Sequence, residues 1–489
     1  MIDTSAFRAS LAPLVFAALL LLGACAVPFA PGYRIEQQRM EVRYVGAPPV
    51  QLHIRATYRL KNTGTADLDS LEVVLPDEQA FGRRSLRAQV DGREVAVERN
   101  GDGSSRFTHI QLAPSWPQKQ RRSLVFEYDL APAPPGRAAL AVNDGSFHIR
   151  DAAAFPILRP PKGFFAAGGE HPTEIELTFR VPADFRVFAG GRERGSQRRS
   201  GETEARFRLA KRDPDSLVVA GRYQEKEVSA GGGKVIFWTF EPLEADQAQA
   251  AATRLAATFE TYRTAFGPIE KIPPPVRMIE THARLIQEAA GSEDAVGVAI
   301  PAGALLNGQA FALGITSDAF LDLAEHELAN TWFGQAIVPR RRVEPALGEG
   351  LIEYAALVAA EARGGEAARR ARVALLLRRF DESRKQAADK PLLRLEPSDP
   401  FEQRVFGYSK GALFFVALED EYGKENVRRA LAHLVSSLRG ERFGFAALMS
   451  TLELETGQKL GEFFRLWLNQ TGIPAEVRSR YDQETKPTQ

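Results

Sequence analysis

One stretch of sequence, Asp322–Tyr354, decides the class of this chain: DLAEHELANTWFGQAIVPRRRVEPALGEGLIEY. If its first part is helical, His326 and Asn330 lie one turn apart on one face, the spacing of a two-ligand metal clamp. Glu327, beside the first position, could take a proton from a metal-bound water. Glu349 follows Asn330 by 19 residues in a second expected helical segment. A His-Glu pair alone is more often ordinary core, so the surrounding motifs decide the interpretation.

Four segments in order resemble one family, the gluzincin aminopeptidases related to membrane alanyl aminopeptidase. His326–Gly334 (HELANTWFG) resembles the zinc helix of that family, H-E-x-x-H-x-W-F-G. Gly348–Tyr354 (GEGLIEY) resembles its N-E-G-F-A-x-Y segment, which carries the third zinc ligand. Tyr408–Ala412 (YSKGA) resembles its Y-x-K-G-A motif, and Phe464–Pro474 resembles the end of its catalytic domain. The resemblance covers most of the chain.

The resemblance implies a multidomain fold, an N-terminal antiparallel β-sandwich or saddle followed by an α-rich, thermolysin-like catalytic domain. It also implies a zinc metallopeptidase that acts on a peptide or protein substrate. One zinc ion would be held by His326 and Glu349, with Asn330 at the degenerate position of the second zinc histidine. Glu327 would be the general base, and Tyr408 would donate a hydrogen bond to the oxyanion.

Two departures from the family pattern leave the function open. Asn330 stands where the family has its second zinc histidine, and an amide oxygen is a poorer zinc ligand than imidazole. Asp322, one turn before His326, could replace it, although a solvated or capping carboxylate is the commoner role. Asp294 is expected where the family has the glutamate that holds the α-amino group of the substrate. The alternatives are a zinc metallopeptidase, a catalytically inactive pseudo-peptidase that binds peptides or proteins, and, less favoured, a purely structural envelope lipoprotein.

The N-terminus contains a targeting segment. Leu11–Leu22 is a 12-residue apolar run, long enough for a signal-peptide core and short for a membrane span. It leads into Leu22–Cys25 (LGAC), which resembles the bacterial lipoprotein signal, and Cys25 is the only cysteine. We therefore expect residues 1–24 to be removed and Cys25 to be lipidated. The protein would be secreted across the inner membrane and lipid-anchored in the bacterial cell envelope; the alternative is a plain secretory signal.

Hydrophobic periodicity divides the rest of the chain. After a linker at residues 25–32, alternation with period two, as in Leu52, Ile54, Ala56, Tyr58 and Leu60, predicts a β domain over residues 33–233. Apolar residues at helical spacing then predict a helix that ends at Gly267-Pro268; they are Ala248, Ala251, Leu255, Phe259, Tyr262 and Phe266. We expect the peptidase domain over residues 234–474, a tail over 475–489, and a hinge at Gly231-Gly232-Gly233.

Composition excludes several classes of protein. The chain has 489 residues, with 63 Lys and Arg against 62 Asp and Glu, so its net charge is +1. Nucleic-acid binding needs a basic excess and is not expected. One cysteine cannot form a disulfide framework or a thiolate metal cage. The near-neutral total also gives no second membrane signal, so a lipid on Cys25 would hold the protein alone.

Overall fold

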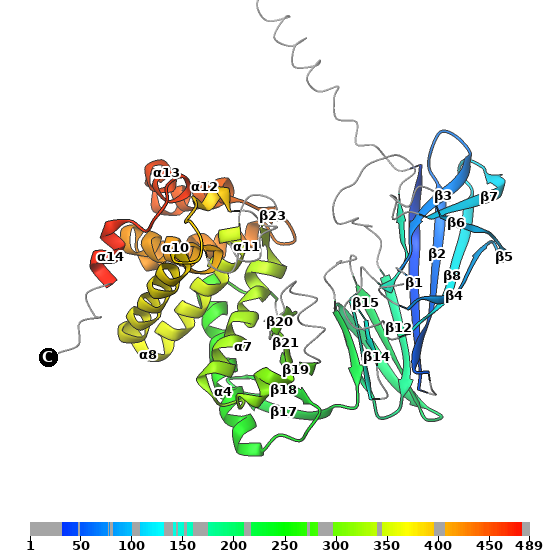
Figure 1. Ribbon diagram of the computed structural model, residues 1–489, viewed down its shortest axis with the longest axis horizontal. Helices are drawn as coiled ribbons and strands as arrows, with labels where there is room; N and C mark the ends of the chain where they lie inside the picture. Colours follow the sequence, from blue (N-terminus) through cyan, green and yellow to red (C-terminus); the bar gives the residue numbers. More distant parts are fainter. Residues whose placement is uncertain are drawn as a thin grey trace, which may run out of the picture.

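The computed structural model describes residues 32–46, 49–76, 78, 82–99, 108–131, 140–142, 145–150, 154–159, 175–209, 217–270, 274–281, 297–339, 345–395 and 406–481. A sheet-rich first domain is followed by a second domain in which helices cover a smaller sheet (Figure 1). The expected order of a β-rich and then an α-rich part is confirmed. Within the described residues, the helices are all too short or too polar to cross a membrane.

The first domain is built on an eight-stranded sheet, whose strands lie side by side in Figure 1 in the order β14-β15-β12-β1-β2-β8-β4-β5. The predicted alternation forms β2, in which Leu52, Ile54, Ala56, Tyr58 and Leu60 are buried and their neighbours are not. The strands are β1 (Tyr33–Val45), β2 (Gln51–Asn62), β4 (Arg84–Val90), β5 (Arg93–Glu94), β8 (Arg121–Leu130), β12 (Ile175–Pro182), β14 (Arg192–Arg199) and β15 (Glu202–Leu209).

The expectation of a wholly antiparallel domain is wrong for one pair of strands. β1 pairs in parallel with β12, with Gln38 opposite Ile175. The two strands are joined by a long connection, as a parallel pair requires. Two four-stranded sheets, built from strands of that connection and, in one of them, from two strands that follow β12, share one hydrophobic core with the large sheet. Their strands are β3 (Leu68–Val74), β6 (Val97–Arg99), β7 (Thr108–Trp116) and β11 (Ile157–Arg159), and β9 (Leu140–Val142), β10 (Ser146–Arg150), β13 (Arg186–Ala189) and β16 (Leu217–Gly221).

The sheet of the second domain begins earlier than predicted. Its order is β17-β18-β19-β21-β20, and β17 forms a hairpin with β18. Gly231 and Gly232 form the turn of this hairpin with positive φ angles of 56° and 77°, so the three glycines are not a hinge. The predicted boundary at residue 233 thus falls inside the hairpin. The strands are β17 (Gln224–Ala230), β18 (Gly233–Thr239), β19 (Val276–Thr281), β20 (Gly297–Ile300) and β21 (Gly303–Asn307).

The helices follow the predicted periodicity most closely in α4 (Ala245–Phe266), whose six predicted apolar residues are all buried. Gly267, with φ of 81°, ends the helix as expected. The predicted tail is partly helical, because Ala475–Tyr481 forms α14 and buries Val477 and Tyr481. The other elements are α6 (Gly308–Ala312), α7 (Asp318–Asn330), η1 (Thr331–Ala336), β22 (Val338–Pro339), α8 (Pro345–Arg384), η2 (Leu392–Arg394), α10 (Tyr408–Tyr422), α11 (Lys424–Ser437), β23 (Arg442–Phe443), α12 (Phe445–Thr456) and α13 (Gly461–Asn469).

The two domains share a small hydrophobic cluster, which we call the interdomain cluster. The first domain contributes Phe188 and Val219, the connecting segment Tyr223, and the second sheet Trp238, Ile279, Ile300 and Leu305. Beside it, the buried His148 of β10 is hydrogen-bonded to Thr281 of β19. The second sheet therefore packs with one face against the first domain and with the other against α4 and α7 (Figure 1).

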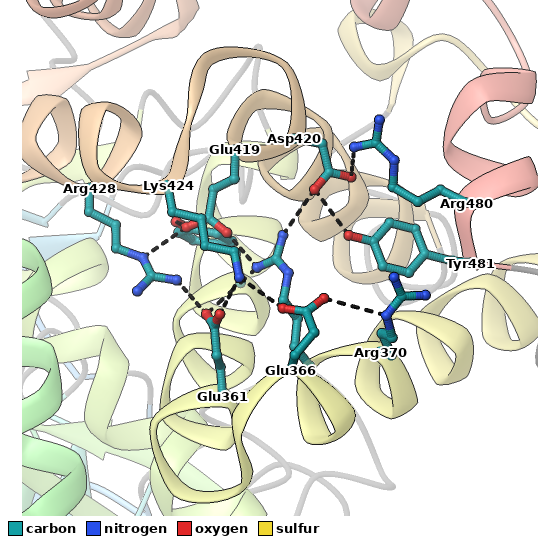
Figure 2. Close-up of polar contacts among 11 residues, drawn as sticks. Glu361, Glu366, Arg370, Glu419, Asp420, Lys424, Arg428, Arg480 and Tyr481 are labelled. Carbon is teal, nitrogen blue, oxygen red and sulfur yellow. Dashed lines mark hydrogen bonds and ion pairs between the residues drawn. The ribbon is translucent and has the colours of Figure 1, made fainter.

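A cluster of charged side chains joins helices α8, α10, α11 and α14 of the second domain. Glu419 of α10 lies at its centre and is fully buried. It is paired with Arg369 of α8 and Arg428 of α11, and it accepts a hydrogen bond from the Tyr354 hydroxyl at 2.6 Å. Figure 2 shows this arrangement, in which Tyr481 of α14 also donates to the neighbouring Asp420. We call these groups the Glu419 cluster.

Candidate metal centre and peptide site

Helix α7 positions the first two candidate residues. Ser317 caps its N-terminus by accepting a hydrogen bond from Phe320 N. One face, which includes Glu327, is buried, and His326 is nearly so, with 11% of its side chain exposed. The next turn is the π-helix η1, which begins after Asn330 and buries Trp332 and Phe333. These two aromatic side chains are core residues.

A close helix crossing brings the remaining residues to α7. Gly350 of α8 faces Gly411 of α10, and a methyl group added at Gly350 would lie 2.5 Å from the Gly411 Cα atom. Glycine is required here because the two backbones touch. Glu349 therefore lies beside Tyr408, the first residue of α10. The crossing joins two motifs that are about 60 residues apart in the chain.

The structure brings His326, Glu349 and Tyr408 together. The Nε2 atom of His326 lies 3.4 Å from Glu349 Oε2, and the His326 ring stacks on Tyr408 with centroids 5.5 Å apart. Glu327 is buried beside them. A methyl group added at Gly297, in the outermost strand β20, would lie 3.1 Å from Glu327 Oε1. The candidate site therefore lies directly beside a sheet edge.

Sequence reasoning missed two residues that hold His326. Glu353 accepts a hydrogen bond from His326 Nδ1 at 3.1 Å. Arg372 donates to Glu353 at 3.0 Å and to Asp322 at 3.2 Å. Asp322 is therefore held in ion pairs, also with Arg254 at 2.7 Å, and is not a replacement metal ligand. The spacing of Glu353, four residues after Glu349 on one helix, was the signal that could have revealed it.

Buried carboxyl groups dominate the electrostatics of the site. Burial alone would lower the pKa of His326, but Glu349 and Glu353 outweigh it and raise that pKa well above the usual range. Burial, opposed by His326 and assisted by Glu349, raises the pKa of Glu327 to about 7. Burial and the neighbouring Glu349 also raise the pKa of Tyr408. Three buried carboxyl groups thus lie around one histidine.

The donor atoms fit a catalytic zinc ion only in part. Zinc bonded to nitrogen and oxygen at about 2.0–2.1 Å would separate those atoms by about 3.4 Å in a tetrahedron. The 3.4 Å between His326 Nε2 and Glu349 Oε2 matches, and that buried oxygen accepts no hydrogen bond from the described residues. A third protein ligand is missing, because Asn330 stands in its place. Its Oδ1 atom is directed at the next helical turn, 2.7 Å from where a Gly334 methyl group would lie.

The described residues contain no group of three His, Cys, Asp or Glu side chains that could hold a metal ion. Since catalytic zinc sites use three protein ligands, the residues present do not fit the ion that the resemblance implies. Two predicted residues could not be placed in the site. Asp294, the expected substrate contact, and Cys25, the expected lipidation site, both lie outside the described residues.

Comparisons with solved structures identify the fold. An M1 zinc metallopeptidase from Deinococcus radiodurans has a TM-score of 0.60 at 16% identity, covering 91% of this chain and 95% of that one. A mutant of it has a TM-score of 0.61 at 16% identity, covering 91% and 96%. The mutant bound to a Tyr-Ser-Ala substrate has a TM-score of 0.61 at 17% identity, covering 91% and 96%. No protein-family model and no curated protein matches the chain.

The chain therefore has the fold of the M1 zinc metallopeptidases, over nearly its whole length and theirs. This confirms the two-domain architecture that the resemblance implied. The identity of 16–17% shows the fold alone, so activity must be argued from the residues of this chain.

Proposed function

We propose that this protein is a peptide-binding pseudo-peptidase, which holds an extended polypeptide segment in the cleft of a peptidase fold and does not cleave it. One observation carries the proposal. Asn330 replaces a zinc ligand, and its carboxamide oxygen is directed toward Gly334. No third ligand completes the site among the described residues, and His326 is held between the carboxylates of Glu349 and Glu353.

Strand β20 supports the binding part of the proposal. Among the described residues it is the last strand of its sheet and pairs with β21 alone, so no described strand covers its other edge. Gly297, Val298 and Ala299 are partly exposed. An extended peptide can add to such an edge through main-chain hydrogen bonds. A peptide placed there would pass Glu327, because Gly297 lies against that carboxyl group.

A second candidate, an active zinc metallopeptidase, is favoured by one specific observation. The 3.4 Å between His326 Nε2 and Glu349 Oε2 matches two corners of a zinc tetrahedron, and Glu327 and Tyr408 are both retained. This candidate requires Asn330 to turn and supply its oxygen, or a water molecule to complete the site. Either function is compatible with lipid anchoring at Cys25 in the cell envelope, which we propose on the sequence motif alone.

The deciding experiment compares zinc content and peptide hydrolysis in the wild type and in Asn330→His. We expect the wild type to purify with well under 0.1 equivalents of zinc after dialysis, since first-shell losses exceed the roughly 10–100-fold effects of outer-shell changes. Asn330→His should bind close to one equivalent. A matched control, Asn330→His with Glu327→Gln, should bind zinc equally well but hydrolyse nothing. Stoichiometric zinc in the wild type, with hydrolysis that Glu327→Gln abolishes, would establish the metallopeptidase instead.

Binding is tested separately from cleavage. A mixture of unstructured peptides is incubated with the wild type, and retained peptides are identified and measured by calorimetry. The proposal expects recovery of intact peptides and competition among them for one site. Ala299→Pro removes one backbone donor from the free edge of β20, because the turn that pairs Ile300 with Gly303 directs the N–H of Val298 toward β21 and that of Ala299 outward. It should weaken binding about tenfold or more, since proline cannot donate to a strand. A wild type that retains no peptide would contradict the binding function.

A further inference from the structure

The near-neutral total charge hides two domains of opposite charge. Residues 33–223 contain 30 Lys and Arg against 24 Asp and Glu, a net charge of +6. Residues 224–489 contain 32 against 37, a net charge of −5. Attraction to a charged surface depends on the local field within about 10 Å, and the total charge is a poor guide to it. The first domain is therefore the part that can contact an anionic partner.

Within that domain, the basic excess is displayed on the outer face of the eight-stranded sheet, meaning the side chains that alternate with the buried ones. Most acidic side chains there are already neutralised by a neighbour. Glu36 pairs with Arg34 and Arg121, and Glu204 with Arg180 and Arg206. The other pairs are Arg39–Glu176, Arg43–Glu202, Arg55–Glu127 and His53–Asp129. What remains on this face is mainly positive.

Strand β14, at the edge of this sheet, carries the strongest unneutralised charge. Its sequence is RERGSQRR, and all eight residues are exposed. Among the described residues, none forms an ion pair or hydrogen bond with Arg192, Arg194, Arg198 or Arg199. Charged side chains also prevent edge strands from aggregating. That role does not require a single sign of charge, whereas Glu193 is the only acid in β14.

We propose that the outer face of the eight-stranded sheet, together with β14, docks on an anionic lipid surface. The partner is inferred to be a membrane because the proposed lipidation site, Cys25, lies only a few residues before this sheet. β1 belongs to this sheet and begins at Tyr33, eight residues after Cys25. Eight extended residues reach at most about 29 Å, so a lipid on Cys25 would keep the sheet close to a bilayer. A basic surface and an acyl anchor reinforce each other.

This inference replaces the expectation that a lipid anchor would hold the protein alone, and it does not depend on the proposed peptide binding. The test is cosedimentation with vesicles. The protein starts at residue 25, which keeps every described residue, and carries Cys25→Ser so that no lipid is attached. We expect binding to vesicles containing phosphatidylglycerol and none to neutral phosphatidylcholine vesicles. Raising the salt from about 0.1 M to 0.5 M should weaken it at least tenfold.

Variants locate the surface. Replacing Arg192, Arg194, Arg198 and Arg199 together by serine should weaken vesicle binding at least tenfold. The matched control removes four exposed charges from the second domain and should change binding less than twofold; it combines Arg378→Ser, Arg394→Ser, Arg442→Ser and Lys459→Ser. If the β14 variant fails to fold by circular dichroism, Arg59→Ser with Lys61→Ser tests the outer face from its central strand β2, and should weaken binding about threefold or more.

Three results would overturn the proposal. One is equal binding to neutral and anionic vesicles. Another is an equal loss in the matched control, which would show that total charge matters and location does not. The third is binding to a soluble polyanion such as heparin, with no binding to vesicles, which would indicate a polymer partner in place of a membrane.

Discussion

Two buried polar clusters in the second domain differ in how completely their charges are matched. In the Glu419 cluster, two arginines and a tyrosine hydroxyl surround the central carboxylate (Figure 2). In the candidate site, Glu327, Glu349 and Glu353 surround one histidine and one arginine. The first cluster is balanced and joins helices. The second contains more carboxylates than cations, and burial together with the neighbouring Glu349 raises the pKa of Glu327 to about 7.

Buried charge thus serves two purposes within one domain. A matched cluster is expensive to disturb, because each partner that remains is an uncompensated buried charge. An unmatched cluster lowers stability and is retained where a surface must receive a ligand. Substitutions in the two clusters should therefore have different effects on stability.

The largest effect should come from the balanced cluster. Glu419→Gln leaves Arg369 and Arg428 without their central counter-charge, so we expect a loss of about 3–5 kcal/mol in the free energy of unfolding. Urea titration measures it. The control, Glu366→Gln, removes a carboxylate that is 53% exposed, and should cost less than about 0.5 kcal/mol. Equal effects would mean that the Glu419 cluster does not hold the helices together.

The next effect concerns the helix crossing that serves both clusters. Gly350→Ala would place a methyl group 2.5 Å from the Gly411 Cα atom, so α8 and α10 must separate, at a cost of about 1–3 kcal/mol. Gly348→Ala is the matched control, since a methyl group there meets nothing within 4 Å, and it should be neutral or slightly stabilising. Urea titration of both variants decides, and a neutral Gly350→Ala would refute the backbone contact.

The unmatched cluster should respond in the opposite direction. A raised pKa means that the folded protein favours the neutral form of Glu327, so the ionised carboxylate lowers stability as the pH rises from about 4.5 through about 7. Glu327→Gln keeps the neutral form, and we expect it to stabilise the zinc-free protein at pH 8 by about 1–3 kcal/mol. Thermal unfolding at pH 8 and pH 5 measures it. Destabilisation at pH 8 would show that Glu327 is paired.

The smallest effect on stability should come from Glu361, at the edge of the Glu419 cluster. Burial would raise the pKa of Glu361, but hydrogen bonds from Lys424 and Arg428 lower it overall. Its contribution is present above the unfolded pKa, near 4.5, and is lost as the pH falls through the lower folded value. The stability difference between wild type and Glu361→Gln should therefore be largest near pH 7 and shrink toward pH 3. Solvent near these side chains keeps it below about 1 kcal/mol.

Local sequence patterns predicted the elements of the fold better than their pairing. Period-two alternation predicted β2, and helical spacing predicted α4 with its end at Gly267. The parallel contact between Gln38 and Ile175 could not be predicted, because nothing in either strand specifies a partner so distant in sequence. The hairpin at Gly231 was misread for a related reason: glycines allow a turn and a hinge equally well.

The candidate site could be predicted as far as its motifs extend. They predicted that His326, Glu349 and Tyr408 would meet, and they do. They did not predict Arg372, which reaches Glu353 because α8 breaks at Gly365, where φ is 66°, and its second half folds back on the first. The roles of Glu327 and Tyr408 in a reaction stay predictions. The composition also did not reveal how the charge is distributed, because the opposite net charges of the two domains cancel in the sum over 489 residues.

The interdomain cluster has a consequence for how such a protein can be divided or recombined. Ile300 lies in β20, the proposed peptide-binding strand, yet its side chain packs with Phe188 and Val219 of the first domain. A chimera that joined this second domain to another β domain would leave Trp238 and Ile300 facing water. The two domains must therefore be inherited as one unit, with substitutions on one side of the interdomain cluster compensated on the other.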